Sequence, residues 1–128
     1  MKTALAAAVL LTAAIGHPVP AAAQHGPGRG IPAQFHGRWA ENVRACVPTH
    51  FTTAITITRD GWSSFEEGGE VTRVGQVRGT THYFRMSNSA NGETTTGSLA
   101  LRRIGPRLGI TFHDDTDQPV HAVLIRCR

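Results

Sequence analysis

The segment Phe35-His36-Gly37-Arg38-Trp39-Ala40, which continues to Cys46, decides the fold of this chain. It has the composition of an opening β-strand, and Cys46 can form a disulfide with Cys127, the next-to-last residue. An antiparallel sheet closes into a barrel when its first and last strands lie side by side. The segment therefore predicts an all-β domain in which the two ends of the fold are covalently tied.

The chain after Phe35 has the pattern of an all-β sandwich or barrel. Short runs rich in Thr, Val, Ile and aromatic residues alternate with turn residues at intervals of about 8–12 residues. Eight strands are predicted, over residues 38–45, 52–58, 62–66, 70–77, 80–87, 94–104, 107–113 and 120–127, with turns that include Asp60-Gly61, Gly68-Gly69, Asn91-Gly92 and Gly105-Pro106. Short turns make neighbouring strands antiparallel, which favours an eight-stranded up-and-down barrel. A sandwich of two four-stranded sheets is the alternative.

The last predicted strand is apolar on both faces, with Val120, Ala122 and Leu124 on one and Val123 and Ile125 on the other. This pattern is typical of a strand that is covered on both sides. An eight-stranded barrel is just wide enough to be filled by its side chains or to hold one small ligand. We expect a filled interior because the strands carry many large apolar residues, among them Phe65, Phe84, Phe112, Leu99, Leu101 and Leu108.

Residues 1–34 are expected to lie outside the barrel domain, which we place at residues 35–128. Met1-Lys2, an apolar run from Ala4 to Ile15 and the small residues Ala21-Ala22-Ala23 make the pattern of a secretory signal peptide, residues 1–23. The run is shorter than the roughly 20 residues that a transmembrane helix needs. Residues 24–34, rich in Gly and Pro, predict a flexible tether. We expect an exported chain, periplasmic or secreted, with no transmembrane segment after cleavage.

Charge and cysteine content narrow the class of protein further. The formal net charge is +4, but the arginines are scattered rather than clustered, which disfavours nucleic acid as a partner. Two cysteines in an exported chain favour a disulfide, and Cys46 and Cys127 allow only one pairing. That bond would close a loop of about 80 residues. Such a cross-link is worth at most roughly 4 to 5 kcal/mol.

Gly37-Arg38-Trp39 on the first strand, with Arg126 on the last, resembles the pattern of the lipocalins and the wider calycin group. In those proteins a Gly-x-Trp packs near an arginine of the closing strand and seals one end of the barrel. A guanidinium can lie over an indole face while its donors reach backbone carbonyls. The resemblance implies that Gly37, Trp39 and Arg126 close this barrel. In size, leader and disulfide, the chain also resembles small periplasmic β-barrel inhibitors of bacterial hydrolases.

Two clusters of titratable residues are candidate sites. His113, Asp115 and His121, with Asp114 and Asp117, fall around one turn, where imidazoles and carboxylates could converge on a metal ion. A solvated polar turn is the favoured interpretation. Glu66, Glu67 and Glu70 flank Gly68-Gly69 and could act as paired acids, although an exposed hairpin tip is favoured. No catalytic, cofactor-binding or metal-binding residue is assigned.

The sequence favours a binding protein over an enzyme. There is no Gly-x-Ser-x-Gly elbow and no glycine-rich phosphate loop between a strand and a helix. We expect a monomeric, non-enzymatic, lipocalin-like barrel without a cofactor that binds a small apolar ligand or a protein. The alternative is an inhibitor of a protease or lysozyme-type hydrolase that inserts the tether or a hairpin tip. A metal protein or enzyme using His113, Asp115 and His121 is a distant third hypothesis.

Overall fold

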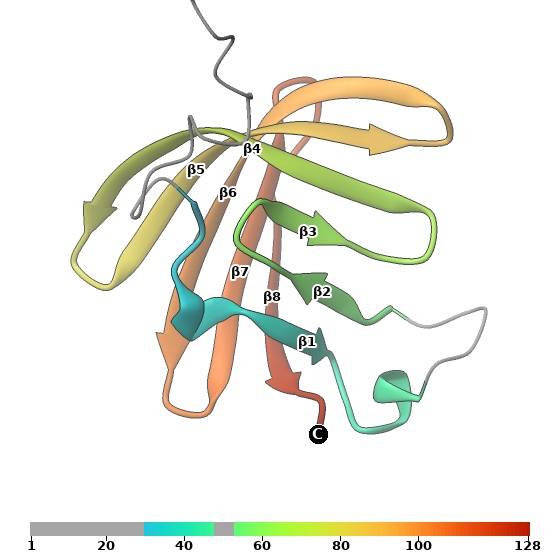
Figure 1. Cartoon of the computed structure of the whole chain (residues 1–128), viewed down its shortest axis with the longest axis vertical. Coiled ribbons are helices and arrows are strands. Elements are labelled where there is room, and N and C mark those ends of the chain that lie inside the picture. Colours follow the sequence, from blue (N-terminus) through green and yellow to red (C-terminus); the bar gives the residue numbers. More distant parts are fainter. Residues whose placement is uncertain (1–29, 48–52) are drawn as a thin grey trace, which may run out of the picture.

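The computed structural model describes residues 30–47 and 53–128, which form a closed barrel of eight antiparallel strands (Figure 1). The strands are β1 (Gly37–Ala40), β2 (Ile55–Ile57), β3 (Gly61–Ser63), β4 (Glu67–Arg78), β5 (Thr81–Ala90), β6 (Glu93–Ile104), β7 (Arg107–Asp114) and β8 (Val120–Arg126). Each strand pairs with the next along the chain, and β8 pairs with β1. The predicted up-and-down barrel is confirmed, and the two-sheet sandwich is excluded. The predicted signal peptide lies outside the described residues.

Closure of the barrel depends on the short contact between β1 and β8. Trp39 pairs with Arg126, and the amide of Cys127 donates a hydrogen bond of 2.9 Å to the carbonyl of Arg38. Cys46 and Cys127 form the predicted disulfide, with an S–S distance of 2.03 Å. Cys46 is not on a strand, however. The predicted first strand, residues 38–45, ends at Ala40, and the chain then turns into the 3-10 helix η3 (Arg44–Cys46).

The strands differ greatly in length, so the barrel wall is tall on one side and low on the other (Figure 1). β4 and β6 have 12 residues each and β5 has 10, whereas β1 has 4 and β2 and β3 have 3. Because three strands are short, all eight strands surround the interior over only part of the barrel's height. The hydrophobic core lies in that part.

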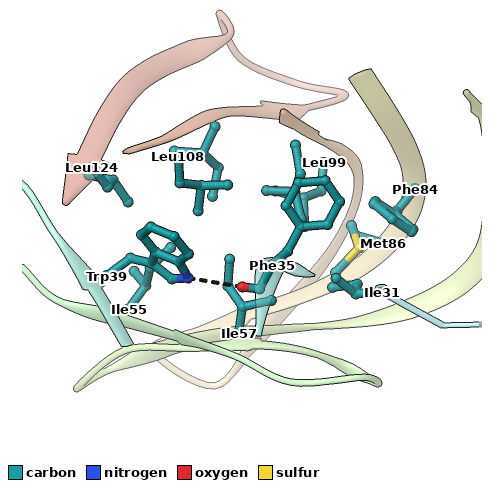
Figure 2. Close-up of a cluster of buried hydrophobic side chains, with 12 residues drawn as sticks. Ile31, Phe35, Trp39, Ile55, Ile57, Phe84, Met86, Leu99, Leu108 and Leu124 are labelled. Carbon is teal, nitrogen blue, oxygen red and sulfur yellow. Dashed lines mark hydrogen bonds between the residues drawn. The ribbon is translucent and has the colours of Figure 1, made fainter. Parts of the chain in front are cut away.

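The core consists of inward-facing residues from all the strands except β3 and β4, together with residues from the segment before β1 (Figure 2). It contains Ile31, Phe35, Trp39, Ile55, Ile57, Phe84, Met86, Leu99, Leu101, Leu108, Ile110 and Leu124. Alternate residues along β5 and β7 supply it, as the side-chain period of a strand requires. Full burial of one such side chain contributes about 1.5–3 kcal/mol, so each member of this cluster stabilises the fold appreciably.

The segment expected to be a tether is packed where the structure describes it. Ile31 is 2% exposed, and its amide donates a hydrogen bond of 2.8 Å to the carbonyl of Arg59. The 3-10 helix η2 (Ala33–Phe35) follows and buries Phe35 completely. The packed domain therefore begins before Phe35, because the end of the barrel gains apolar contacts from Ile31. Residues 24–29 of the predicted tether lie outside the described residues.

One predicted turn is wrong and two are confirmed. Gly68 and Gly69 are part of β4, and the tip of that hairpin is at residues 64–66. Asn91 and Gly92 both have positive φ (51° and 80°), the geometry of a type I′ hairpin turn. Gly105, with a φ of 57°, forms the turn between β6 and β7.

The expectation that β8 is covered on both sides is also wrong. Val123 on its outer face is 49% exposed, and Val120 at its start is 62% exposed. Leu124 on the inner face is 4% exposed. The outer surface of β8 is apolar without being buried by the described part of the chain.

Candidate functional site

The two ends of the barrel differ, because turns alternate between opposite ends of an up-and-down barrel. Trp39 lies at one end, fully buried, and its Nε1 donates a hydrogen bond of 2.9 Å to the carbonyl of Phe35 (Figure 2). The guanidinium of Arg126 lies 4.8 Å from the centre of the Trp39 ring and donates a 2.6 Å hydrogen bond to the carbonyl of His36. Gly37 has a φ of +124°, which side chains rarely allow. We call this the closed end.

The three residues expected to close the barrel are thus brought together, and a fourth joins them. The guanidinium of Arg103 lies 5.1 Å from the centre of the Trp39 ring and donates hydrogen bonds to the carbonyls of Gln34 and Gly105. Sequence reasoning missed Arg103. Its place two residues before Gly105 is the signal that could have located it, because that turn lies at the same end of the barrel as Trp39.

The opposite end of the barrel is hollow. A cavity of about 960 Å³ opens there and is lined by described residues from every strand from β2 to β8, from the hairpin tip between β3 and β4, and from Thr53 just before β2. The lining consists of Thr53, Ile55, Trp62, Ser64, Phe65, Glu66, Glu67, Gly68, Asn88, Ser89, Ala90, Glu93, Thr95, Phe112, Asp114 and Val120. The predicted filled interior is therefore correct for the closed half only. We call this hollow the open-end cavity.

Two aromatic rings form the inner wall of the open-end cavity. The rings of Trp62 and Phe112 lie 4.8 Å apart between their centres and are tilted by 58°. Both side chains also pack against the core. Phe65, at the hairpin tip, is 59% exposed at the rim. Aromatic walls with a few polar groups are typical of sites for small organic ligands.

Two polar atoms at the base of this wall have no hydrogen-bond partner among the described residues. They are Nε1 of Trp62, a donor, and Oδ1 of Asn88, an acceptor. A Cβ on Gly69 would lie 2.6 Å from the first and 2.4 Å from the second, so both face the same small volume above Gly69. A buried polar group without a partner costs about 1–3 kcal/mol. One donor and one acceptor without a partner are thus buried close together beside Gly69.

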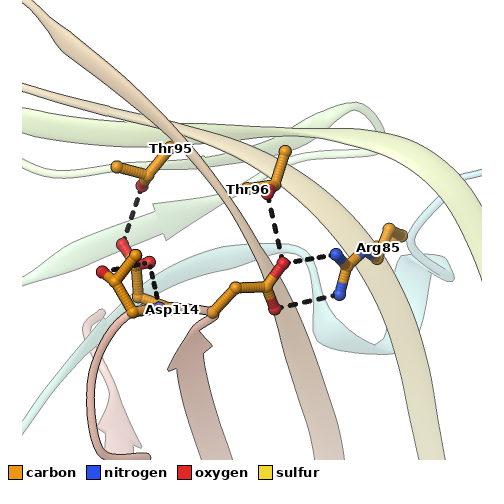
Figure 3. Close-up of polar contacts among 6 residues, drawn as sticks. Arg85, Thr95, Thr96 and Asp114 are labelled. Carbon is orange, nitrogen blue, oxygen red and sulfur yellow. Dashed lines mark hydrogen bonds and ion pairs between the residues drawn. The ribbon is translucent and has the colours of Figure 1, made fainter.

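Asp114 is the most firmly held charge in the open-end cavity (Figure 3). Its carboxylate accepts hydrogen bonds from the Thr95 hydroxyl, at 2.7 Å, and from the amide and hydroxyl of Thr116. The bond from Thr95 is the main cause that lowers the pKa of Asp114, and the Thr116 amide adds to it. The group therefore remains a carboxylate at neutral pH, with its orientation fixed.

The candidate metal ligands around the turn after β7 do not converge, which agrees with the favoured interpretation of a solvated polar turn. Asp115 forms a two-pronged ion pair with Arg85 (Figure 3), and Nδ1 of His121 lies 2.9 Å from the hydroxyl of Thr111. His113 pairs with Ser98 across β6 and β7. Within residues 30–47 and 53–128, no three His, Cys, Asp or Glu side chains converge as a metal ion would require.

The glutamates of the second cluster separate. Glu66 and Glu67 line the open-end cavity, whereas Glu70 is exposed on β4 and does not. Sequence reasoning placed all three at one hairpin tip, because it took Gly68-Gly69 as the turn. Glu93 and Asp114, distant in sequence from Glu66, were not expected beside it. They come together because the hairpins that carry them end at the same end of the barrel.

Comparisons with protein-family models, with curated proteins and with solved structures found no match to this chain. In the described part of the chain, no helix has the length and apolar character that crossing a membrane requires.

Proposed function

We propose that this protein is an exported, non-enzymatic, lipocalin-like binding protein that takes a small, partly apolar ligand into the open-end cavity. The observation that carries the proposal is a cavity of about 960 Å³ with an aromatic wall at one end of an otherwise filled barrel. Drug-sized ligands occupy pockets of about 300–1,000 Å³ with mainly apolar linings.

The closed end supports the lipocalin-like character of the proposal. Arg126 lies over the Trp39 ring, as the resemblance to lipocalins implies, and the strand order is that of an up-and-down barrel. A barrel sealed at one end and open at the other admits a ligand by a single route. The tie between Cys46 and Cys127 supports export, since disulfides persist mainly in oxidising compartments.

Binding without catalysis fits the chemistry of Asp114. A general base works best when its pKa lies near the working pH. The hydrogen bonds from Thr95 and Thr116 lower the pKa of Asp114, which weakens it as a proton acceptor at neutral pH. The group is better suited to hold a ligand than to move a proton.

The proposal is tested with the neutral fluorescent probe N-phenyl-1-naphthylamine. The wild type should raise the probe's fluorescence, and Ala90→Trp, which fills the cavity, should weaken binding at least about tenfold. Thr80→Trp, an exposed change in the turn after β4 at the closed end, is the matched control and should bind as the wild type does. The proposal fails if the wild type does not bind the probe, or if Ala90→Trp binds it as tightly.

A second candidate function is inhibition of a secreted hydrolase by the hairpin between β3 and β4. Phe65 at its tip is 59% exposed, as an inserting side chain would be. A panel of proteases and lysozymes would be assayed with the wild type and with Phe65→Ser. Slowing of one enzyme by the wild type, and not by the variant, would support this function. No slowing of any enzyme would remove it.

A further inference from the structure

We infer that the open-end cavity selects an organic cation, an amine or amidine carried on an aromatic or alkyl body. The inference rests on the proposed function and names the class of ligand. Four of the chain's nine carboxylates line the cavity, namely Glu66, Glu67, Glu93 and Asp114. None of the described lining residues is an arginine or a histidine. A cavity on a chain with a net positive charge therefore has a negative lining.

The arginines of the barrel lie elsewhere. Arg103, Arg107, Arg126 and Arg128 line a groove at the closed end. On β5, Arg85 alternates with the inward-facing Phe84 and Met86, so it points outward, where it pairs with Asp115. Four carboxylates therefore line the mouth, and four guanidinium groups line the groove at the sealed end. Such a distribution attracts cations to the mouth and disfavours anions.

One carboxylate at the mouth, that of Asp114, lies on the same strand face as an aromatic ring of the cavity wall. Asp114 and Phe112 are two residues apart on β7, so their side chains point to the same face of the strand. Phe112 stacks against Trp62 on the cavity wall. A cation is attracted to the face of an aromatic ring as well as to a carboxylate. An ammonium beside Asp114 with its apolar body against Trp62 and Phe112 would use both.

The buried polar atoms beside Gly69 do not select a charge. Nε1 of Trp62 is a donor and Oδ1 of Asn88 is an acceptor, and neither has a partner among the described residues. An acceptor on a ligand would suit the first as well as an N–H group would suit the second. The preference for a cation therefore follows from the charge of the lining and from the aromatic wall.

The test uses three compounds with one apolar body and different charges. They are 3-phenylpropylammonium, 3-phenylpropanol and 3-phenylpropanoate, titrated into the disulfide-bonded protein by calorimetry at about pH 7. The ammonium should bind at least about tenfold more tightly than the alcohol, and the carboxylate should bind most weakly. High salt should weaken binding of the ammonium and leave binding of the alcohol unchanged.

Two pairs of variants locate the effect. Asp114→Asn should reduce the affinity for the ammonium to that of the alcohol, and the control Asp60→Asn, in the turn between β2 and β3 at the closed end, should not. If Asp114→Asn does not fold, the double variant Glu67→Gln/Glu93→Gln is used instead, with Glu70→Gln as its control. The double variant should likewise reduce the affinity for the ammonium to that of the alcohol, and Glu70→Gln should not. Thermal unfolding shows which variants are folded.

The outcomes separate this inference from the function on which it rests. Equal binding of the three compounds, or tightest binding of the carboxylate, would overturn the preference for a cation and leave a ligand-binding barrel. Binding of the ammonium that survives both the Asp114 and the Glu67/Glu93 changes would also overturn it. No binding of any of the three compounds, or of N-phenyl-1-naphthylamine, would overturn both.

Discussion

Arg126 lies over Trp39 with 4.8 Å between its guanidinium carbon and the ring centre, and this contact joins the last strand of the barrel to the first. β1 and β8 share few backbone pairs, because β1 has only 4 residues. Side chains must therefore supply part of the closure that a longer ladder would give. The hydrogen bond from Arg126 to the carbonyl of His36 fixes the guanidinium in that position.

We predict that Arg126→Met lowers the free energy of unfolding by about 1–2 kcal/mol. The change removes a cation–π contact, worth about 0.5–1 kcal/mol at an exposed site, and a charged hydrogen bond to His36. Urea unfolding followed by Trp fluorescence would measure the loss. Arg107→Met at the same end is the control, and it should change stability by less than about 0.5 kcal/mol. Equal losses in the two variants would contradict a specific role for Arg126.

We predict that the double variant Cys46→Ala/Cys127→Ala is less stable by about 2–5 kcal/mol. The disulfide joins residues separated by 81 positions, so its removal frees a long loop in the unfolded chain. Calorimetric unfolding of the variant, beside the wild type with and without reductant, would measure this. Reduced wild type should match the variant. A variant as stable as the oxidised wild type would show that the β1–β8 contact holds without the bond.

Much of the fold could be predicted from local pattern. Alternating apolar residues and turn residues located all eight strands, and two cysteines at the ends of the domain indicated closure. Gly68 and Gly69 were misread because paired glycines usually mark turns. At this place glycine is needed for space instead, since a Cβ on Gly69 would lie 2.4 Å from Oδ1 of Asn88. That requirement depends on a neighbouring strand, which a local pattern does not contain.

The open-end cavity could not be predicted for a related reason. The number of large apolar residues shows that the chain can fill a core. It does not show where along the barrel axis that core lies. The position of the core depends on where the short strands β1, β2 and β3 end relative to the long strands β4, β5 and β6. Those relative positions are set by the pairing register of all eight strands. Glu66 and Asp114 line the same cavity for the same reason, although 48 positions of sequence separate them.

We predict that Gly69→Ala lowers the free energy of unfolding by about 1–3 kcal/mol and weakens binding in the open-end cavity. The added methyl would displace Trp62 or Asn88, because it would lie 2.6 Å from Nε1 of the first and 2.4 Å from Oδ1 of the second. Urea unfolding and titration with N-phenyl-1-naphthylamine would measure the two effects. Gly68→Ala, with its nearest atom 3.2 Å away, is the control for stability and should lower it less. Unchanged binding by Gly69→Ala would show that the base of the cavity does not contact the probe.

Because of the ion pair between Asp115 and Arg85, the free energy of unfolding of the barrel should depend on pH in the acid range. Hydrogen bonds from Arg85 are the main cause that lowers the pKa of Asp115, and Thr96 contributes. A carboxyl whose pKa is lower in the folded state stabilises fully above its unfolded pKa of about 3.9. That contribution is lost as the pH falls through the folded pKa. Both side chains are partly exposed, so salt weakens the effect.

We therefore predict that Asp115→Asn has a lower melting temperature than the wild type at pH 7 and a smaller decrease between pH 5 and pH 2. The two proteins should converge at the acid end, because the wild-type carboxyl is then protonated and no longer pairs with Arg85. Arg85→Gln should show the same flattened pH dependence, since it removes the main cause of the lowered pKa. Melting curves of the three proteins at low salt would measure this. Parallel curves that keep their separation down to pH 2 would mean that Asp115 stabilises the barrel by packing or neutral hydrogen bonds rather than by its charge.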